Sequence, residues 1–305
     1  MQPLLAIEPT FRNRLLRHDP ASAPWLEALP GHFVDVCARW NLWQSDAPRY
    51  GGTSIVIPVH GAPEGEAALK IVSPLADPAT ENLALAALAG HGVVRLFRFH
   101  EESRALLLER LDGPALSEHN DRFEVARIAG AVARTIASVP APPDAPRLCD
   151  TSRRWLPMLQ EQHAQARSAG NALPEATFHR AARIVEGLTA EASTTLTHGD
   201  LSLENILRRD DGVWIAIDPG YLCAPVEYEA HTILRGLLAA LMASADPRAA
   251  LRDVIAQFCE AAQADAARAE ELSFARFVAS FYWESQHEGD PADVERLRRA
   301  VEVTT

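Results

Sequence analysis

Two aspartates and one asparagine constrain this chain more than any other feature. Asp200 lies five residues before Asn205, and Asp218 follows thirteen residues after Asn205. Asp218 ends the apolar run 213–217, which is typical of a short buried strand. Since Asp210-Asp211-Gly212 predicts a hairpin turn before that run, we expect Asn205 and Asp218 to lie close together at the ends of two paired strands.

These residue types fit a phosphoryl-transfer site. One carboxylate must accept the proton of a hydroxyl group, while an amide oxygen and a second carboxylate bind Mg²⁺ against the phosphates. We therefore expect Asp200 as the base, Asn205 and Asp218 as Mg²⁺ ligands, and ATP as the co-substrate, with GTP as an alternative on which the sequence is silent. The alternative is a structural hairpin with a solvated Asp at each end. A lone His-Gly-Asp would favour that alternative, but the complete spacing does not.

The segment 198–205, together with Asp218-Pro219, resembles the catalytic core of the aminoglycoside phosphotransferase family. Members of that family have a protein-kinase-like fold and phosphorylate small molecules, and Asp-Pro replaces the Asp-Phe-Gly of protein kinases. The segments 25–30 and 38–42 resemble the branch that contains streptomycin 6-phosphotransferase and hydroxyurea kinase. That branch commonly has Lys after Asp-Pro, whereas this chain has Gly220.

The resemblance implies an α+β class, bilobal fold with a small mixed β lobe followed by a larger, mainly helical lobe. We expect a nucleotide-binding lobe at 1–111 and a catalytic and acceptor-binding lobe at 112–305. The pattern predicts strands near 53–60, 66–72, 93–99 and 104–111. It predicts helices at 21–42, 121–138, 152–168, 174–191, 226–245, 247–268 and 272–287. Residues 1–20 and 300–305 are expected to be loosely held.

Lys70 lies in a predicted strand among apolar residues and is the only lysine of the chain. An Arg could not replace it freely, because a planar guanidinium and a compact ammonium bind phosphates differently. The resemblance implies that Lys70 contacts the α- and β-phosphates and that Glu81, in the first turn of a helix, orients it. The alternatives are a solvated Lys on an edge strand and a Glu that only compensates the helix dipole.

Two more segments supply expected nucleotide contacts. Gly51-Gly52 would let backbone amides approach phosphates, and Ser54 would add a hydroxyl donor, although Gly-Gly more often makes an ordinary turn. The resemblance makes 105–111 the last strand of the small lobe and the start of the hinge. It implies that adenine binds the backbone of Glu109 and Leu111, and a plain edge strand is the alternative.

The acceptor is expected to bind in the helical lobe, facing Asp200. Trp155 and Trp283 are candidates for its apolar cover, although core packing explains both more simply. His198 is expected to organise the catalytic loop by hydrogen bonding rather than to transfer protons. A solvated surface charge is the simpler explanation for each of the acidic candidates for binding a cationic acceptor, which are Asp150, Glu204, Glu227, Glu229 and Glu284.

Composition argues against several classes of protein. A formal net charge of −12 disfavours nucleic-acid binding and is compatible with a cationic substrate. No apolar stretch is long enough to span a membrane, and the N-terminus lacks a signal pattern, so we expect a cytoplasmic protein. The four cysteines show neither a metal-binding nor a disulfide pattern. The sequence does not indicate an oligomeric state.

Together these features predict an ATP-dependent O-phosphotransferase that acts on a small-molecule hydroxyl. The resemblance implies an aminoglycoside such as streptomycin as acceptor, and antibiotic resistance as the role. One alternative is a kinase for a sugar, a nucleoside antibiotic, or a choline-like or ketosamine acceptor. Another is a nucleotide-binding pseudokinase, which the joint presence of Lys70, Asp200, Asn205 and Asp218 disfavours.

Overall fold

The computed structural model describes residues 5–61, 63–287 and 289–305. The chain divides into two compact units. The first runs to Gly113 and includes Arg209–Asp211, and the second comprises Pro114–Arg208 and Gly212–Thr305. No helix within the described ranges combines the length and the hydrophobicity that crossing a bilayer would require.

The first unit is built on a six-stranded sheet. Its strands are β1 (Leu42–Gln44), β2 (Arg49–Tyr50), β3 (Ser54–Gly61), β4 (Gly65–Val72), β5 (Leu96–His100) and β6 (Ala105–Glu109). Their order is β1-β3-β4-β6-β5, with β2 also paired to β3, and all pairs are antiparallel. The strand β4 therefore has a hydrogen-bonded neighbour on both sides.

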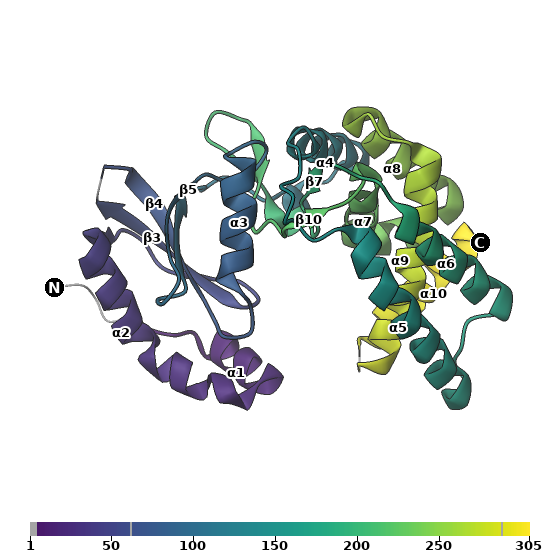
Figure 1. Ribbon diagram of the computed structural model, residues 1–305, viewed down its shortest axis with the longest axis horizontal. Helices are drawn as coiled ribbons and strands as arrows, with labels where there is room; N and C mark the ends of the chain where they lie inside the picture. The colour runs from purple at the N-terminus through teal and green to yellow at the C-terminus, as the bar shows by residue number, and fades with distance from the viewer. Residues whose placement is uncertain (1–4, 62, 288) are drawn as a thin grey trace. The chain divides into compact units, whose positions relative to one another are not determined.

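Alternation along the strands gives this sheet two different faces. Successive side chains of a strand point to opposite faces. The odd-numbered residues of the three central strands are buried in one apolar core: Ile55, Ile57, Val59, Ala67, Leu69, Ile71, Ala105 and Leu107. Helices α1 (Pro9–His18) and α2 (Ala23–Trp40) complete this core, and α3 (Pro78–Leu88) lies on the opposite side of the sheet from α2 (Figure 1).

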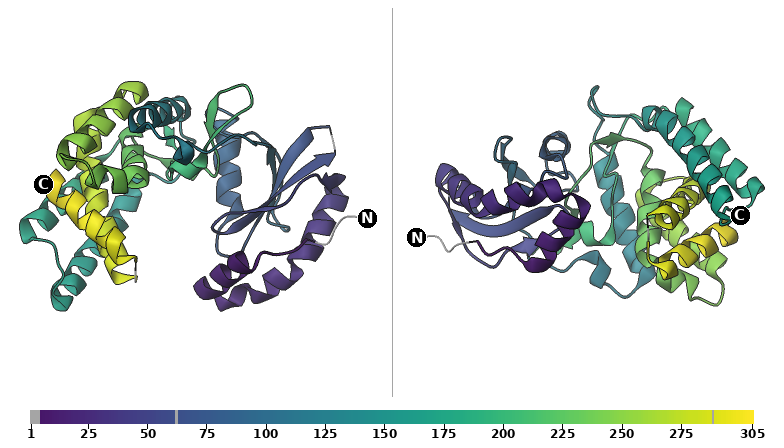
Figure 2. Two further views of the ribbon diagram at one scale, coloured as in Figure 1. Left: turned by 180° about the vertical axis from the view of Figure 1, so that it is seen from behind. Right: turned by 90° about the horizontal axis from the view of Figure 1, so that it is seen from below.

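The second unit is mainly helical. Its helices are α4 (Arg122–Ala137), α5 (Leu148–Ala169), α6 (Glu175–Gly187), α7 (Ala230–Met242), α8 (Pro247–Ala262), α9 (Ala266–Gln286) and α10 (Pro291–Thr304). The strands β7 (Leu196–Thr197) and β10 (Leu222–Cys223) form one antiparallel pair, and β8 (Ile206–Arg208) and β9 (Trp214–Ala216) form another. The helices α9 and α10 lie side by side (Figure 2).

Three predicted helices are shorter than expected. The predicted helix 174–191 ends at Gly187, before a separate 3-10 turn at Leu188–Ala190. The predicted helix 226–245 begins with a separate 3-10 turn, η5 (Val226–Glu229), before α7 starts. The predicted helix 247–268 ends at Ala262, because Gln263 adopts a left-handed conformation with φ of 54°. Asp265 then caps α9 by accepting hydrogen bonds from the backbone of Ala267 and Arg268.

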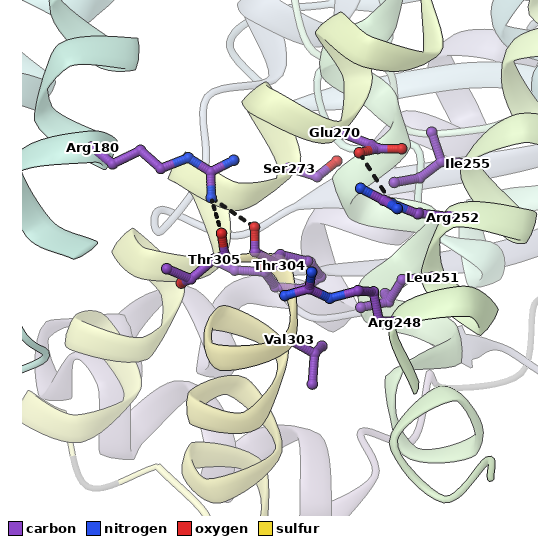
Figure 3. A pocket seen from close by; sticks show the side chains of 11 residues that line it. Arg180, Arg248, Leu251, Arg252, Ile255, Glu270, Ser273, Val303, Thr304 and Thr305 are labelled. Carbon is purple, nitrogen blue, oxygen red and sulfur yellow. Dashed lines mark hydrogen bonds and ion pairs between the residues drawn. The ribbon is translucent and has the colours of Figure 1, made fainter. Parts of the chain in front are cut away.

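The expectation that both ends of the chain are loosely held is wrong for the residues described. The helix α1 buries Phe11 and Leu15, which lie one turn apart on the face toward the sheet. At the other end, Arg180 of α6 donates hydrogen bonds to the carbonyl oxygens of Thr304 and Thr305 (Figure 3). Those carbonyls lack partners within their own helix, so the arginine satisfies them. Residues 1–4 lie outside the described ranges.

The helices α4 and α8 approach closely at Gly130. A Cβ atom added to Gly130 would lie 2.3 Å from the carbonyl oxygen of Phe258 and 3.0 Å from the Cβ of Ala261. The first contact is with backbone, which cannot move away as a flexible side chain can. The contact between the two helices therefore requires a residue without a side chain.

We expect Gly130→Ala to destabilise the helical unit by about 2 kcal/mol or more, the usual cost of overpacking a core. The matched control is Gly187→Ala in α6, where an added Cβ would meet nothing within 4 Å. That control should leave the stability unchanged or raise it slightly, because alanine favours helix. Urea unfolding followed by circular dichroism measures both. Equal unfolding midpoints for Gly130→Ala and the wild type would contradict the close packing.

Candidate active site

The strands β7 and β10 enclose the segment that carries the predicted catalytic residues. Leu222 pairs with Thr197, so the chain leaves the first strand and returns beside it. Between them, β8 and β9 form the predicted hairpin, in which Ile206 pairs with Ala216. Asn205 immediately precedes β8 and residue 217 immediately follows β9. The pairing therefore places the asparagine and the approach to Asp218 at the same end of the hairpin.

Two hydrogen bonds of the Ile217 backbone join the approach to Asp218 to Asn205 and to His198. Its N–H donates to the carbonyl oxygen of Asn205 at 2.8 Å. Its carbonyl oxygen accepts from Nε2 of His198 at 2.7 Å, which requires the proton on that ring nitrogen. The N–H of Gly220 donates to the carbonyl oxygen of His198 at 2.7 Å. His198 is fully buried. Through these two hydrogen bonds, its ring and its carbonyl group connect the loop of Asp200 to the loop of Asp218.

Backbone conformation at three positions explains the residue types found there. Gly199 has φ of 82°, a region that glycine adopts without strain. Gly220 lies so close to His198 that an added Cβ would be 3.1 Å from its carbonyl oxygen, which favours glycine where the related branch commonly has lysine. Asp218 has φ of 57°, a left-handed conformation that costs about 1–3 kcal/mol for a non-glycine residue. The flanking hydrogen bonds hold Asp218 in this conformation.

The three predicted polar side chains have different environments. The side-chain amide nitrogen of Asn205 donates to the carbonyl oxygen of Asp200 at 3.0 Å, which leaves its Oδ1 as the atom able to bind a cation. Asp200 and Asp218 are exposed, and Asn205 is partly buried. Within the described part of the chain, no group donates a hydrogen bond to the carboxylate of Asp200. That carboxylate is therefore able to accept a proton from a substrate.

The buried carboxylate of Glu229 stabilises the loop that carries Asp200. This residue is 1% exposed, and its carboxylate accepts hydrogen bonds from the N–H groups of Gly199 at 2.6 Å and Leu201 at 3.4 Å. These two amides flank Asp200. The sequence predicts Glu229 only as a candidate for binding the acceptor, which stays a prediction, and gives no sign of these contacts with the two amides. Because 30 residues separate it from Gly199, no local pattern indicates the contact.

The other acidic candidates are mostly engaged with protein groups. Asp150 lies 3.3 Å from Arg153, and Glu284 lies 3.2 Å from Arg235. Glu227 accepts a hydrogen bond from the N–H of Asp265, the capping residue of α9, at 2.9 Å. Glu204 is exposed in the 3-10 turn that contains Asn205. Binding of an acceptor by any of these side chains stays a prediction.

Lys70 and Glu81 form an ion pair in the first unit. The Nζ of Lys70 lies 2.7 Å from Oε2 of Glu81, and only 6% of the Lys70 side chain and 12% of the Glu81 side chain are exposed. Lys70 pairs with Val56 on one side and Leu106 on the other, so it lies on a central strand rather than an edge strand. As an even-numbered residue it points to the face that α3 covers, where Glu81 meets it. Its contact with a nucleotide stays a prediction.

The remaining nucleotide-binding candidates have mixed environments. Ser54 is buried at the start of β3, and its carbonyl oxygen accepts from the N–H of Gly51 in a tight turn. The N–H of Glu109 donates to the carbonyl oxygen of Arg95 at 2.9 Å, so it is not free for adenine. The carbonyl oxygen of Leu111 accepts from Arg49 at 3.3 Å. Contacts of Ser54, Glu109 and Leu111 with a nucleotide stay predictions.

The oxygen donors of the hairpin fit a magnesium ion. Among the described residues, no group of three or more His, Cys, Asp or Glu side chains is arranged to hold a metal. Magnesium at a phosphoryl-transfer site needs fewer protein ligands, because phosphate oxygens and water complete its coordination. Asn205 Oδ1 and the carboxylate of Asp218 are hard oxygen donors, and the hydrogen bonds of Ile217 join the segments that carry them.

Comparison of the sequence with known proteins identifies related enzymes. The sequence model for aminoglycoside/hydroxyurea antibiotic resistance kinases matches residues 39–288. A streptomycin 6-kinase from Streptomyces griseus is 29% identical over 261 residues, which are 85% of this chain and 84% of the relative. A hydroxyurea phosphotransferase from Kitasatospora aureofaciens is 33% identical over 213 residues, which are 68% of this chain and 62% of the relative.

Comparison with solved structures identifies the fold. The choline kinase LicA from Streptococcus pneumoniae superposes with a TM-score of 0.55 at 14% identity, covering 86% of this chain and 92% of that one. The macrolide 2'-phosphotransferase MphH from Brachybacterium faecium gives a TM-score of 0.51 at 16% identity, covering 90% and 98%. The predicted protein-kinase-like fold, with a mixed β part and a larger helical part, is confirmed.

We expect Glu229→Gln to loosen the catalytic loop. A glutamine keeps one acceptor oxygen, so one of the two amides that flank Asp200 loses its partner, at a cost of about 1–3 kcal/mol. Amide hydrogen exchange of Gly199 and Leu201 should therefore become faster. Glu204→Gln, on an exposed residue of the same loop, is the control and should leave both rates unchanged. Unaltered exchange in Glu229→Gln would show that its carboxylate does not support the loop.

Proposed function

The chain belongs to the family of aminoglycoside/hydroxyurea antibiotic resistance kinases, and we propose that it transfers the γ-phosphoryl group of ATP to a hydroxyl group of a small molecule. As a member of this family it is a small-molecule kinase. The observation that carries the proposal is the hydrogen bonding of Ile217. Through it, Asp218 and Asn205 are fixed at one end of the hairpin, beside the loop of Asp200.

The proposed reaction is a direct in-line transfer. The hydroxyl oxygen of the acceptor forms a bond to the γ-phosphorus, the bond from that phosphorus to the bridging β,γ-oxygen breaks, and ADP leaves. Asp200 orients the hydroxyl and accepts its proton. Asn205 and Asp218 would hold Mg²⁺, which supplies positive charge next to the phosphate oxygens when it is bound. Positioning and charge then account for catalysis without a covalent enzyme intermediate.

The proposed role of the first unit is to bind the nucleotide. Lys70 would contact the α- and β-phosphates, and its ion pair with Glu81 keeps the ammonium group in one position. In protein kinases the equivalent pair must form before transfer occurs. The burial of both side chains supports this role, since a merely solvated lysine would not need a buried partner.

The relatives suggest two types of acceptor. The streptomycin 6-kinase from Streptomyces griseus favours an aminoglycoside such as streptomycin, with antibiotic resistance as the role. The hydroxyurea phosphotransferase from Kitasatospora aureofaciens favours a small uncharged acceptor. A kinase for a sugar, a nucleoside antibiotic, or a choline-like or ketosamine acceptor would share the same catalytic residues. Release of ADP, measured with streptomycin, other aminoglycosides and hydroxyurea, separates these acceptors.

We expect Asp200→Asn to lower the rate of transfer by about 10²–10⁴-fold, the contribution of a general base, while Mg·ATP binding stays nearly unchanged. Asp218→Asn should instead weaken the binding of Mg·ATP, because it removes a negative ligand of the cation. ADP release and calorimetric titration with Mg·ATP measure the two effects.

The control is Asp210→Asn, at the exposed turn of the same hairpin, which removes an equal charge and should alter neither quantity. Near-normal transfer by Asp200→Asn would exclude Asp200 as the base. Unchanged Mg·ATP affinity in Asp218→Asn would exclude Asp218 as a metal ligand.

A further inference from the structure

The helical unit contains an open cavity of about 330 Å³. This volume lies at the lower end of the range for small-molecule sites, which runs from about 300 to 1,000 Å³. Its walls come from α5, η5 and α9. All three elements belong to the second unit, which also carries the catalytic hairpin.

The apolar part of the cavity consists of aromatic and thioether side chains. Trp155 and Met158 of α5 lie on one helix face, and Tyr228 of η5 contributes an aromatic ring. Met158 is 44% exposed although it is a large apolar residue. Exposed apolar groups around a concavity are typical of ligand contact. These side chains suit a flat, apolar ring.

The charged part of the cavity is entirely positive. Arg154 and Arg276 line it, and none of the Asp and Glu residues that the structure describes does. Arg276 donates a hydrogen bond to the carbonyl oxygen of Tyr228 at 2.7 Å, and its guanidinium carbon lies 4.2 Å from the centre of the Tyr228 ring. The guanidinium group of Arg276 therefore already lies against the aromatic ring that a cationic ligand would contact. Within the described ranges, Arg154 makes no ion pair with a carboxylate.

A buried histidine next to the cavity wall adds no charge of its own. Ser280 lines the cavity, and its Oγ lies 3.3 Å from Nε2 of the buried His231. The pKa of His231 lies well below its usual value, because burial disfavours the charged ring and because Arg276 and Arg235 add nearby positive charge. His231 is therefore neutral, so the charged side chains at the cavity wall are the two arginines.

The backbone connects this cavity to the catalytic loop. Tyr228 immediately precedes Glu229, whose carboxylate binds the two amides that flank Asp200. Tyr228, in the cavity wall, is therefore adjacent in sequence to Glu229, which supports the loop of the proposed base. A ligand held against Tyr228 would lie against the same short helix that positions Asp200.

We propose that this cavity binds the acceptor and selects a hydroxylated molecule that has a flat apolar ring and no ammonium or guanidinium group. Trp155, Met158 and Tyr228 contact the ring, and Arg154 and Arg276 face an uncharged or anionic substituent. Streptomycin, which carries guanidinium groups, is then a poor acceptor. The proposal rests on the proposed function for the hydroxyl requirement, whereas the preference for charge rests on the cavity alone.

Three probes of one shape and different charge test the preference: para-(hydroxymethyl)benzoate, its uncharged amide and para-(hydroxymethyl)benzylamine. Calorimetric titration of the full chain, at low ionic strength and without nucleotide, gives the three affinities. We expect the benzoate to bind about tenfold more tightly than the benzylamine, with the amide between them, as two partly solvated positive charges would produce.

Variants assign the preference to the cavity. Arg154→Gln should reduce the ratio between the benzoate and the benzylamine to about threefold, since one of two charges is removed. The matched control is Arg153→Gln, one residue away on the same helix, 68% exposed at its side chain and outside the cavity. It should leave the ratio unchanged. Trp155→Phe should weaken all three probes without altering their ratio.

Four results would overturn the proposal. They are equal or tighter binding of the benzylamine, tight binding of streptomycin that the benzoate competes away, no binding of any probe, and equal effects of Arg154→Gln and Arg153→Gln. Failure of the proposed function gives a different result. In that case the probes bind with the expected ratio, but no acceptor causes ADP release from ATP.

Discussion

The position of Asp218 depends on two hydrogen bonds made by the backbone of the preceding residue. Ile217 donates to the carbonyl of Asn205 and accepts from the ring of His198, so strand β9 cannot shift relative to the loop of Asp200 without losing both. These bonds also compensate the left-handed conformation of Asp218. The relative positions of these segments are therefore maintained mainly by main-chain contacts.

One short helix supports the loop of Asp200 and also forms part of the wall of the cavity that we propose for the acceptor. In η5, Glu229 holds the amides beside Asp200, and the preceding Tyr228 forms part of the cavity wall with Arg276 packed on its ring. The net charge of −12 is compatible with a cationic acceptor. The local distribution differs from the overall charge, because Glu227 and Glu284 bind protein groups while arginines line the cavity. Overall charge is a poor guide to the charge of one pocket.

The sequence predicts features whose determinants lie close together along the chain. The hairpin between Asn205 and Asp218 follows from its turn residues, and Lys70 stands out because it is the only lysine. The helix α1 is not evident from the sequence, because arginines lie among its few apolar residues and its narrow apolar face becomes recognisable only when the sheet covers it. The roles of Glu229 and Arg276 could not be predicted, because each contacts a segment 30 or more residues away.

A single lysine has a practical consequence for studying the protein. Apart from any terminal amine, a reagent that acylates primary amines has one target, Lys70, which is buried between Glu81 and the sheet. Acylation then requires the ammonium group to leave its partner and lose a proton. The labelling rate therefore reports how often the contact between β4 and α3 opens, and it needs no engineered reporter group.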